Sequence, residues 1–351
     1  MSACSKSGFL RSIDRKNPPF EQALRRPRAV SAAVLGAAVA LCTAFPLAAD
    51  ETDAADSAVD GETVLRAYWH TYPDRVSGVS FRGGDWTIKI GETYFCWADA
   101  RLVPEAETRR AWRPHRFTVY PDDIPPPESF SPADIARIRE EAEREYPGRE
   151  TYHPAFFAAL YGGAGRTEME RNLRRVVFLG RAITVHSLIV ERLARIETAI
   201  RAGTDAETAT FLAGIGSIGG YNWREIRGTA RMSYHAFGLA VDILGAAERS
   251  KAVYWMWERE RNPAWMLIPL SRRWKPPDTV IRAFENEGFI WGGTWALYDN
   301  MHFEFRPEMH EIRRLVRARS GSVITPGKNP PGQGETPAGH GADLHHIFPA
   351  R

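Results

Sequence analysis

The chain has 351 residues, 44% hydrophobic and 11% aromatic, which is enough for a packed core in one large domain or two ordinary ones. Its formal net charge of +3 originates in residues 1–49, which hold seven basic and two acidic residues and leave 39 basic against 41 acidic, or −2, in the rest. The composition therefore excludes a largely disordered chain and indicates no basic face for nucleic acid.

The first 49 residues have the pattern of an export signal. Basic Arg25-Arg-Pro-Arg28 precedes an apolar stretch, 29–49, which ends on small residues before the acidic Asp50. We expect cleavage near Ala49 and an exported protein, periplasmic or in the cell envelope. An uncleaved membrane anchor is the alternative, because about 20 apolar residues can span a bilayer.

Residues 50–60 are predicted to be a flexible lead-in, and 61–130 an N-terminal region that contains a β-hairpin. The hairpin is indicated by alternation in 85–97 around the turn residues Gly91-Glu92. Cys96 lies in its second strand, and the other two cysteines lie in the leader. It is therefore predicted to be a buried packing residue rather than a nucleophile or a disulfide partner.

The three prolines of 125–127 continue neither a helix nor a central strand, so 121–128 is predicted to be a linker. Ser131 is the expected N-cap of a charged surface helix that runs to about Glu145 and opens a second domain, 131–318. Apolar residues at helical spacing predict a long amphipathic helix over 181–201, and the glycine-rich 214–220 predicts a turn into a strand. The apolar residues of the expected helix are Ile183, Leu188, Ile189, Leu193, Ile196 and Ile200.

The most informative stretch is Ser233-Tyr-His235-Ala-Phe-Gly238-Leu-Ala-Val-Asp242. Gly238 and the following β-rich run predict a turn into a strand, with His235 on the turn and Asp242 in the strand. Alternation then places Leu239, Val241 and Ile243 on the core face and Asp242 on the other face, directed toward His235.

A second motif, Asp299-Asn-Met-His302-Phe-Glu304, follows sixty residues later. Residues 301–305 alternate, so His302 and Glu304 share the polar face of a strand, and Asp299 lies in the turn before it. Glu304 is expected to accept a hydrogen bond from the His302 imidazole and fix its tautomer.

Two imidazoles and one carboxylate suit a single zinc ion that keeps its fourth position for water, and a second carboxylate can carry the proton of that water. A non-haem iron site also uses two histidines and one carboxylate. The ligand carboxylate Asp242 is seven residues from His235 and not at the short His-x-carboxylate spacing usual for iron, so zinc is preferred.

The two motifs and the Gly292-Gly293-x-Trp295 between them resemble the zinc peptidases of bacterial cell walls over about residues 185–306. That family includes VanY-type D-alanyl-D-alanine carboxypeptidases, D-Ala-D-Ala dipeptidases and L-alanyl-D-glutamate endopeptidases. The residues that carry the resemblance are Ser233, His235, Gly238, Ala240, Asp242, Gly292, Gly293, Trp295, Asp299, His302, Phe303 and Glu304. It implies an α+β domain of the hedgehog/DD-peptidase type, with a small antiparallel sheet that carries the zinc ligands and helices packed on it.

The resemblance implies that His235, Asp242 and His302 bind zinc and that Asp299 is the catalytic base. Aspartate at this position is more typical of the L-Ala–D-Glu endopeptidases, whereas the carboxypeptidases more often carry glutamate there.

The family also holds its substrate with an arginine upstream of the first ligand. Arg224 is the expected residue, with Arg227 behind it. Ser233 either hydrogen-bonds substrate or supports the turn. Trp291, Trp295 and Tyr298 either form walls of the cleft or belong to the core.

The expected activity is hydrolysis of a peptide bond in peptidoglycan stem peptides, by an L-Ala–D-Glu endopeptidase or a D-Ala-releasing carboxypeptidase. The alternative is a non-catalytic zinc module, because sonic hedgehog carries a related zinc fold and acts by binding. We expect a monomer that contacts a membrane only through an uncleaved leader. The Gly- and Pro-rich tail, 319–351, is expected to be disordered, and its histidines to be solvated.

Overall fold

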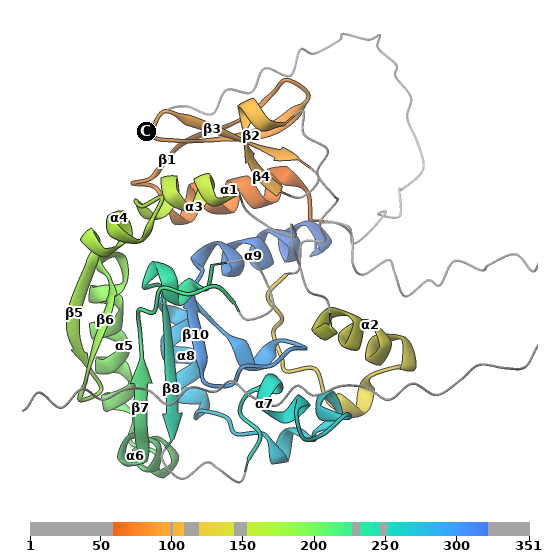
Figure 1. Cartoon of the computed structure of the whole chain (residues 1–351), viewed down its shortest axis with the longest axis vertical. Helices are drawn as coiled ribbons and strands as arrows, with labels where there is room; N and C mark the ends of the chain where they lie inside the picture. Colours follow the sequence, from red (N-terminus) through yellow and green to blue (C-terminus); the bar gives the residue numbers. More distant parts are fainter. Residues whose placement is uncertain are drawn as a thin grey trace, which may run out of the picture. The chain divides into compact units, whose positions relative to one another are not determined.

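The computed structural model describes residues 59–98, 101–108, 119–143, 153–226, 232–245 and 251–321 (Figure 1). All of them belong to one unit, Ala55–Arg351. The predicted leader, nearly all of the predicted lead-in and most of the predicted tail lie outside the described residues. No described helix combines the length and the apolar character needed to cross a membrane.

The described chain mixes α-helices with small antiparallel sheets, as the sequence predicts. The strands are β1 (Val76–Arg82), β2 (Asp85–Ile90), β3 (Thr93–Ala98), β4 (Arg101–Pro104), β5 (Leu173–Phe178), β6 (Arg181–His186), β7 (Ile215–Gly219), β8 (Ala240–Gly245), β9 (Phe289–Trp291) and β10 (His302–Phe305). The α-helices are α1 (Gly61–Thr71), α2 (Pro132–Glu143), α3 (Pro154–Tyr161), α4 (Arg166–Arg171), α5 (Val190–Ala202), α6 (Ala206–Ala213), α7 (Trp255–Arg259), α8 (Asp278–Asn286) and α9 (Pro307–Gly321). Short 3-10 helices include η4 (Ser187–Ile189), η5 (Tyr234–Phe237) and η9 (Gly292–Thr294).

The N-terminal sheet has the order β1-β2-β3-β4, in which each strand pairs with the next along the chain. The predicted hairpin is confirmed: β2 and β3 are antiparallel around Gly91, whose φ of 57° suits glycine. Cys96 is 4% exposed and lies 3.6 Å from the Thr87 hydroxyl, so its predicted packing role is confirmed.

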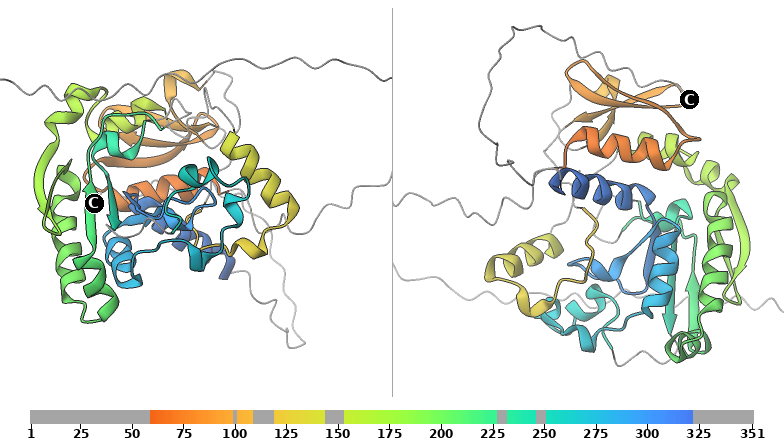
Figure 2. Two further views of the ribbon diagram at one scale, coloured as in Figure 1. Left: turned by 60° about the horizontal axis from the view of Figure 1, so that its bottom comes forward. Right: turned by 180° about the vertical axis from the view of Figure 1, so that it is seen from behind.

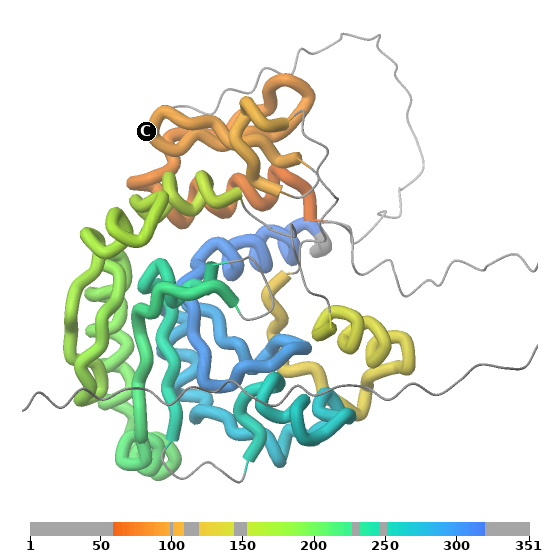
Figure 3. Tube along the Cα trace, viewed as in Figure 1, coloured from red at the N-terminus to blue at the C-terminus, as the bar shows by residue number. Residues whose placement is uncertain are grey.

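Helix α1 packs against β1 and β2 of this sheet and also against α9, so the two ends of the described chain lie together. Figures 1 and 2 show α1 and α9 side by side, and the Cα trace of Figure 3 shows the orange and blue helices adjacent. Buried Val64 and Tyr68 of α1 and Ile312 of α9 belong to one apolar core cluster. The predicted division into 61–130 and 131–318 stays a prediction.

The prediction of one helix over 181–201 is wrong in its first part. Leu179 and Gly180 both have positive φ, 47° and 78°, and make a tight turn that pairs β6 with β5. Ile183 and Val185 alternate on β6, and their β-branched side chains favour a strand. The helix begins only at Val190, after η4, and there the predicted core residues Leu193, Ile196 and Ile200 are buried.

Two further predictions are confirmed. Helix α2 begins at Pro132, the Ser131 hydroxyl accepts a hydrogen bond from the Asp134 amide at 3.1 Å, and all but Ile138 is exposed or half-buried. The glycine-rich segment 214–220 contains β7.

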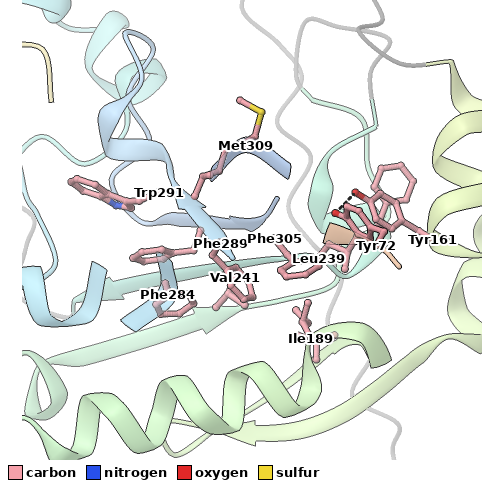
Figure 4. Packing of buried hydrophobic residues seen from close by; sticks show 14 of the residues in the cluster. Tyr72, Tyr161, Ile189, Leu239, Val241, Phe284, Phe289, Trp291, Phe305 and Met309 are labelled. Atoms are coloured by element: carbon pink, nitrogen blue, oxygen red, sulfur yellow. Dashed lines mark hydrogen bonds between the residues drawn. The ribbon is translucent and has the colours of Figure 1, made fainter. Parts of the chain in front are cut away.

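The second sheet has the order β7-β8-β10-β9, and all of its pairings are antiparallel. One face is apolar and packs on α8, where the Phe284 ring stacks on Phe303 with 4.0 Å between centroids. Figure 4 shows Phe284 and Phe289 next to Val241 of β8. Leu239, Val241 and Ile243 are fully buried, which confirms the predicted core face and leaves the other face for the polar residues.

Candidate metal centre

The two central strands of the second sheet place two of the candidate ligands opposite each other. His302 of β10 pairs with Asp242 of β8, and directly opposed residues in an antiparallel pair point to the same face. On the other side of β8, Asp242 pairs with Gly219, which has no side chain to cover the carboxylate. Strand pairing alone therefore brings together residues sixty positions apart.

His235 reaches the same face through the turn before β8. Ser233 caps η5, because its hydroxyl accepts a hydrogen bond from the His235 amide at 3.3 Å. Gly238 ends the turn with φ of 67°, and a Cβ there would lie 2.7 Å from the backbone nitrogen of His186. Only glycine fits this close approach, so the glycine of the motif aims His235 at Asp242.

Three ligand atoms converge at this face. The Asp242 Oδ1 lies 3.1 Å from His235 Nε2 and 2.9 Å from His302 Nδ1, and the two nitrogens are 3.3 Å apart. A tetrahedral zinc ion with bonds of about 2.0–2.1 Å separates its ligand atoms by about 3.3 Å. The three side chains could therefore hold one metal ion.

The hydrogen bonds on the outer side of each imidazole show which nitrogen keeps its lone pair. His235 Nδ1 lies 2.6 Å from the Gly220 carbonyl oxygen, and His302 Nε2 lies 3.1 Å from the Glu304 carboxylate. Both partners only accept, so each of these nitrogens carries the proton of a neutral ring. The inner nitrogens then present lone pairs to the Asp242 carboxylate, an arrangement that needs a cation at its centre.

Without a metal ion, protons on the inner nitrogens can supply that charge, and the pKa shifts refer to this protonated state. Burial would raise the pKa of Asp242, but hydrogen bonds from His235 and His302 and the charges of both rings lower it well below its usual range. Burial would lower the pKa of His302, but Asp242 and Glu304 raise it well above 6.5. The site thus favours positive charge at its centre, which either a proton or a metal ion can supply.

Asp299 lies just before β10, outside the pleated strand, as predicted. Its amide donates to the Gly292 carbonyl at 3.0 Å, and a Cβ on Gly292 would lie 2.6 Å from the Asp299 carbonyl oxygen. Because residue 292 has no side chain, the backbone of Asp299 can approach it this closely just before β10 begins.

Asp299 is half-buried, and its buried Oδ1 accepts no hydrogen bond from any described residue. Burial and the Asp242 charge raise its pKa, the charges of His302 and Arg224 and a hydrogen bond from the Met301 amide lower it, and the net value is about 7. A metal ion beside it would lower this pKa, because a nearby positive charge stabilises the carboxylate.

Glu304 occupies the predicted position. It pairs across the sheet with Ala240, whose small side chain leaves room for the carboxylate beside His302. Its Oε2 accepts from His302 Nε2, so the predicted hydrogen bond is present.

The residues expected to bind substrate are only partly brought together. Arg224 is exposed, and its charge acts on Asp299, so the guanidinium is close enough to the centre to affect it. Arg227 lies outside the described residues. Ser233 is 5% exposed and supports the turn, and its role toward substrate stays a prediction.

The aromatic residues near the motif differ in their positions. Trp291 and Tyr298 belong to the core, with 2% and 0% of their surface exposed. Trp295 is half-buried, and its ring centroid lies 5.6 Å from that of His302.

Sequence reasoning missed three contributors to the centre: the Gly220 carbonyl, Arg306 and Glu308. Arg306 pairs with Glu304 and with Glu308, so the ionic contacts continue past the strand. The sequence does contain a sign of these ionic contacts: basic and acidic residues alternate at every second position from His302 to Glu308.

Comparison with known families agrees with the geometry. A family model described as D-alanyl-D-alanine carboxypeptidase matches residues 227–305. This part of the chain is similar to peptidases. The match includes His235, Asp242, Asp299 and His302.

Outside that stretch the comparisons say less. A second family model, described as a domain of unknown function, matches residues 64–122. No curated protein and no solved structure matches the chain. The match to the peptidase family is therefore confined to the part of the chain that holds the candidate metal centre.

Proposed function

We propose that this chain is a zinc-dependent peptidase that hydrolyses a peptide bond in the stem peptides of peptidoglycan, in a domain of the hedgehog/DD-peptidase type. One observation carries the proposal: three lone-pair atoms converge from His235, Asp242 and His302, and the carboxylate of Asp299 is close enough for the charges of His302 and Asp242 to shift its pKa. The similarity of residues 227–305 to D-alanyl-D-alanine carboxypeptidases supports it.

Each residue has a distinct role. His235 Nε2, His302 Nδ1 and one oxygen of Asp242 would hold the ion, which when bound supplies Lewis acidity to a water molecule and to the scissile carbonyl. Asp299 accepts the proton of the attacking water and later gives it to the leaving amine.

The arginines would bind the substrate. Stem peptides carry free carboxylates, and Arg224 presents an exposed guanidinium near Asp299 that can form a bidentate pair with one. Arg227 is the second candidate.

The bond that is cut is either the L-Ala–D-Glu bond or the one that releases D-Ala. Asp299 in place of glutamate favours the endopeptidase, whereas the description of the matching family favours the carboxypeptidase. Either substrate lies outside the cytoplasmic membrane, so we propose an exported, periplasmic or envelope protein that acts as a monomer.

Digestion of muropeptides by the zinc-loaded full chain, followed by mass spectrometry, tests the proposal and identifies the bond. Zinc removal by a chelator should abolish cleavage, and added zinc should restore it. Asp299→Asn should keep zinc and lower turnover by about 100-fold or more, because it removes the proton acceptor.

Asp278→Asn is a matched control, since this aspartate is 61% exposed on α8 and should leave turnover unchanged. A chain that binds zinc and cuts no stem peptide would instead be the non-catalytic zinc module.

A further inference from the structure

The hydrogen-bonded residues around His302 extend well beyond the metal centre. The Glu304 carboxylate that accepts from His302 places its other oxygen 3.5 Å from an Arg306 nitrogen. The Arg306 Nε then donates to Glu308 at 2.8 Å. Two carboxylates and one guanidinium thus connect the imidazole to the start of α9.

The far end of this series contacts α1. Glu308 is fully buried, and its two oxygens accept from the hydroxyls of Tyr72 at 3.0 Å and of Tyr68 at 3.4 Å. Tyr68 is in α1, and Tyr72 is the residue that follows its last turn. Figure 4 shows the Tyr72 hydroxyl next to that of Tyr161 of α3, at 3.4 Å. We name His302, Glu304, Arg306, Glu308, Tyr68 and Tyr72 the His302–Tyr72 network.

The Tyr72 hydroxyl stays a donor. Burial raises its pKa well above 10, and the charges of Glu308 and Tyr161 raise it further. A protonated phenol donates a hydrogen bond to the carboxylate beside it and carries no negative charge that would repel that carboxylate. The buried charge of Glu308 therefore depends on Arg306 from the ligand strand and on two tyrosines from the N-terminal helix.

Arg306 is fixed on three sides. Its guanidinium contacts Glu304 and Glu308 and lies over the Tyr234 ring, with 5.2 Å to the centroid. The planar guanidinium group of arginine can contact both carboxylates at once, whereas a lysine ammonium is a single point charge. If Glu308 were displaced, Arg306 would lose its second partner and Glu304 would lose its fixed counter-charge.

We propose that α1 positions the ligand His302 through this network, with Tyr72, Glu308 and Arg306 as positioning residues for metal binding. Glu304 must be held in place to accept from Nε2, because only then does Nδ1 present its lone pair to the ion. The region that matches a domain of unknown function, 64–122, thereby gains a role in the metal site. The inference rests on the proposed zinc function.

Zinc affinity of the full-length chain, measured by competition with a chromophoric chelator, tests the proposal. Glu308→Gln should weaken zinc binding by about 10-fold, because loss of the groups that orient a ligand commonly costs 10–100-fold in affinity. Tyr72→Phe should weaken it by a smaller factor, since Tyr68 and Arg306 remain on Glu308.

Tyr120→Phe is the matched control. This buried tyrosine also donates to a carboxylate, Glu285 at 2.6 Å, but neither residue belongs to the network. It should lower the stability of the fold and leave zinc affinity unchanged. Should Glu308→Gln not fold, Tyr72→Phe and Arg306→Lys still decide the question, and Arg306→Lys should weaken zinc although it keeps the charge.

A second readout is independent of both zinc and activity. The imidazole ¹⁵N shifts of the metal-free protein report the hydrogen bonds of the two His302 nitrogens, and Tyr72→Phe should move them while Tyr120→Phe should not. Zinc affinities and shifts equal to those of the unchanged chain in all three network variants would overturn the proposal. An unchanged chain that binds no zinc would overturn the zinc function and this inference with it, whereas zinc binding without cleavage would overturn the peptidase function alone.

Discussion

The two four-stranded antiparallel sheets differ in where their ion pairs lie. At the N-terminal sheet, Arg82 at the end of β1 pairs in solvent with Glu105, with 42% and 45% of each side chain exposed. In the second sheet the His302–Glu304 pair is enclosed, with only 9% and 10% exposed. Solvated pairs contribute little to stability, but enclosed charges must find partners. An enclosed ion pair on a sheet face is thus the better sign of a functional site.

Removal of a proposed zinc ligand should have the largest effect. His302→Ala would leave His235 and Asp242 of the proposed ligand set, so the chain should lose zinc on dialysis. Metal analysis of the purified protein measures the loss. His70→Ala, at a histidine with 41% of its side chain exposed, should keep the metal. Equal zinc in both variants would remove His302 from the ligand set.

The apolar faces of the two sheets give the next comparison. Phe303→Ala should lower the free energy of unfolding by about 3–5 kcal/mol, because this buried ring stacks on Phe284. Phe81→Ala in β1 should cost less than about 1.5 kcal/mol, since that ring is 62% exposed and contacts Trp86 edge-on. Denaturant unfolding measures both losses of stability. Similar losses would mean that the buried ring of Phe303 contributes no more to the core than the exposed ring of Phe81.

Buried His186 should make stability depend on pH. Burial lowers its pKa below 6.5, the bond to the Tyr161 carbonyl opposes this, and Arg75 and Arg174 lower the pKa further. Below pH 6.5 the unfolded chain binds the proton more readily than the folded one. The contribution of neutral, buried His186 to the free energy of unfolding is therefore present above that pH and is lost as the pH falls below it.

The free energy of unfolding should accordingly decrease between about pH 7.5 and about pH 5.5. His186→Asn keeps an acceptor for the Leu188 amide and cannot be protonated, so its unfolding should vary less with pH. An unchanged slope in the variant would mean that other groups cause the pH dependence.

The smallest effect is expected at the solvated face. Arg82→Ala removes an exposed ion pair and a contact with the Tyr94 ring at 4.2 Å, and should cost less than about 1 kcal/mol. A loss above about 2 kcal/mol in thermal or denaturant unfolding would show that the exposure of an ion pair does not determine how much it contributes to stability.

Local pattern was enough to predict the strands that carry the centre. Alternation in 301–305 and the Gly238 turn before β8 predicted which face His302 and Asp242 share, because these features depend on neighbouring residues. The helix predicted over 181–201 was partly wrong because it included Ile183, which is five residues from Leu188, and this spacing puts the two side chains on one face of neither a helix nor a strand. The turn at Leu179 and Gly180, which pairs β6 with β5, decides for a strand.

The contact between Tyr72 and Glu308 could not be predicted in this way. The two residues are 236 positions apart, and neither carries a local sign of its partner. Only the packing of α1 on α9 brings them together. The alternating charges from His302 to Glu308 indicated that a network begins there, but not where it ends.

The meeting of the first and last described helices has a consequence for how the protein folds. Contacts between distant positions form slowly, because a long loop must close before they contribute any stability. A ligand whose support spans nearly the whole described chain is therefore expected to be among the last features to become ordered. We expect metal uptake to follow the completed fold rather than to nucleate it.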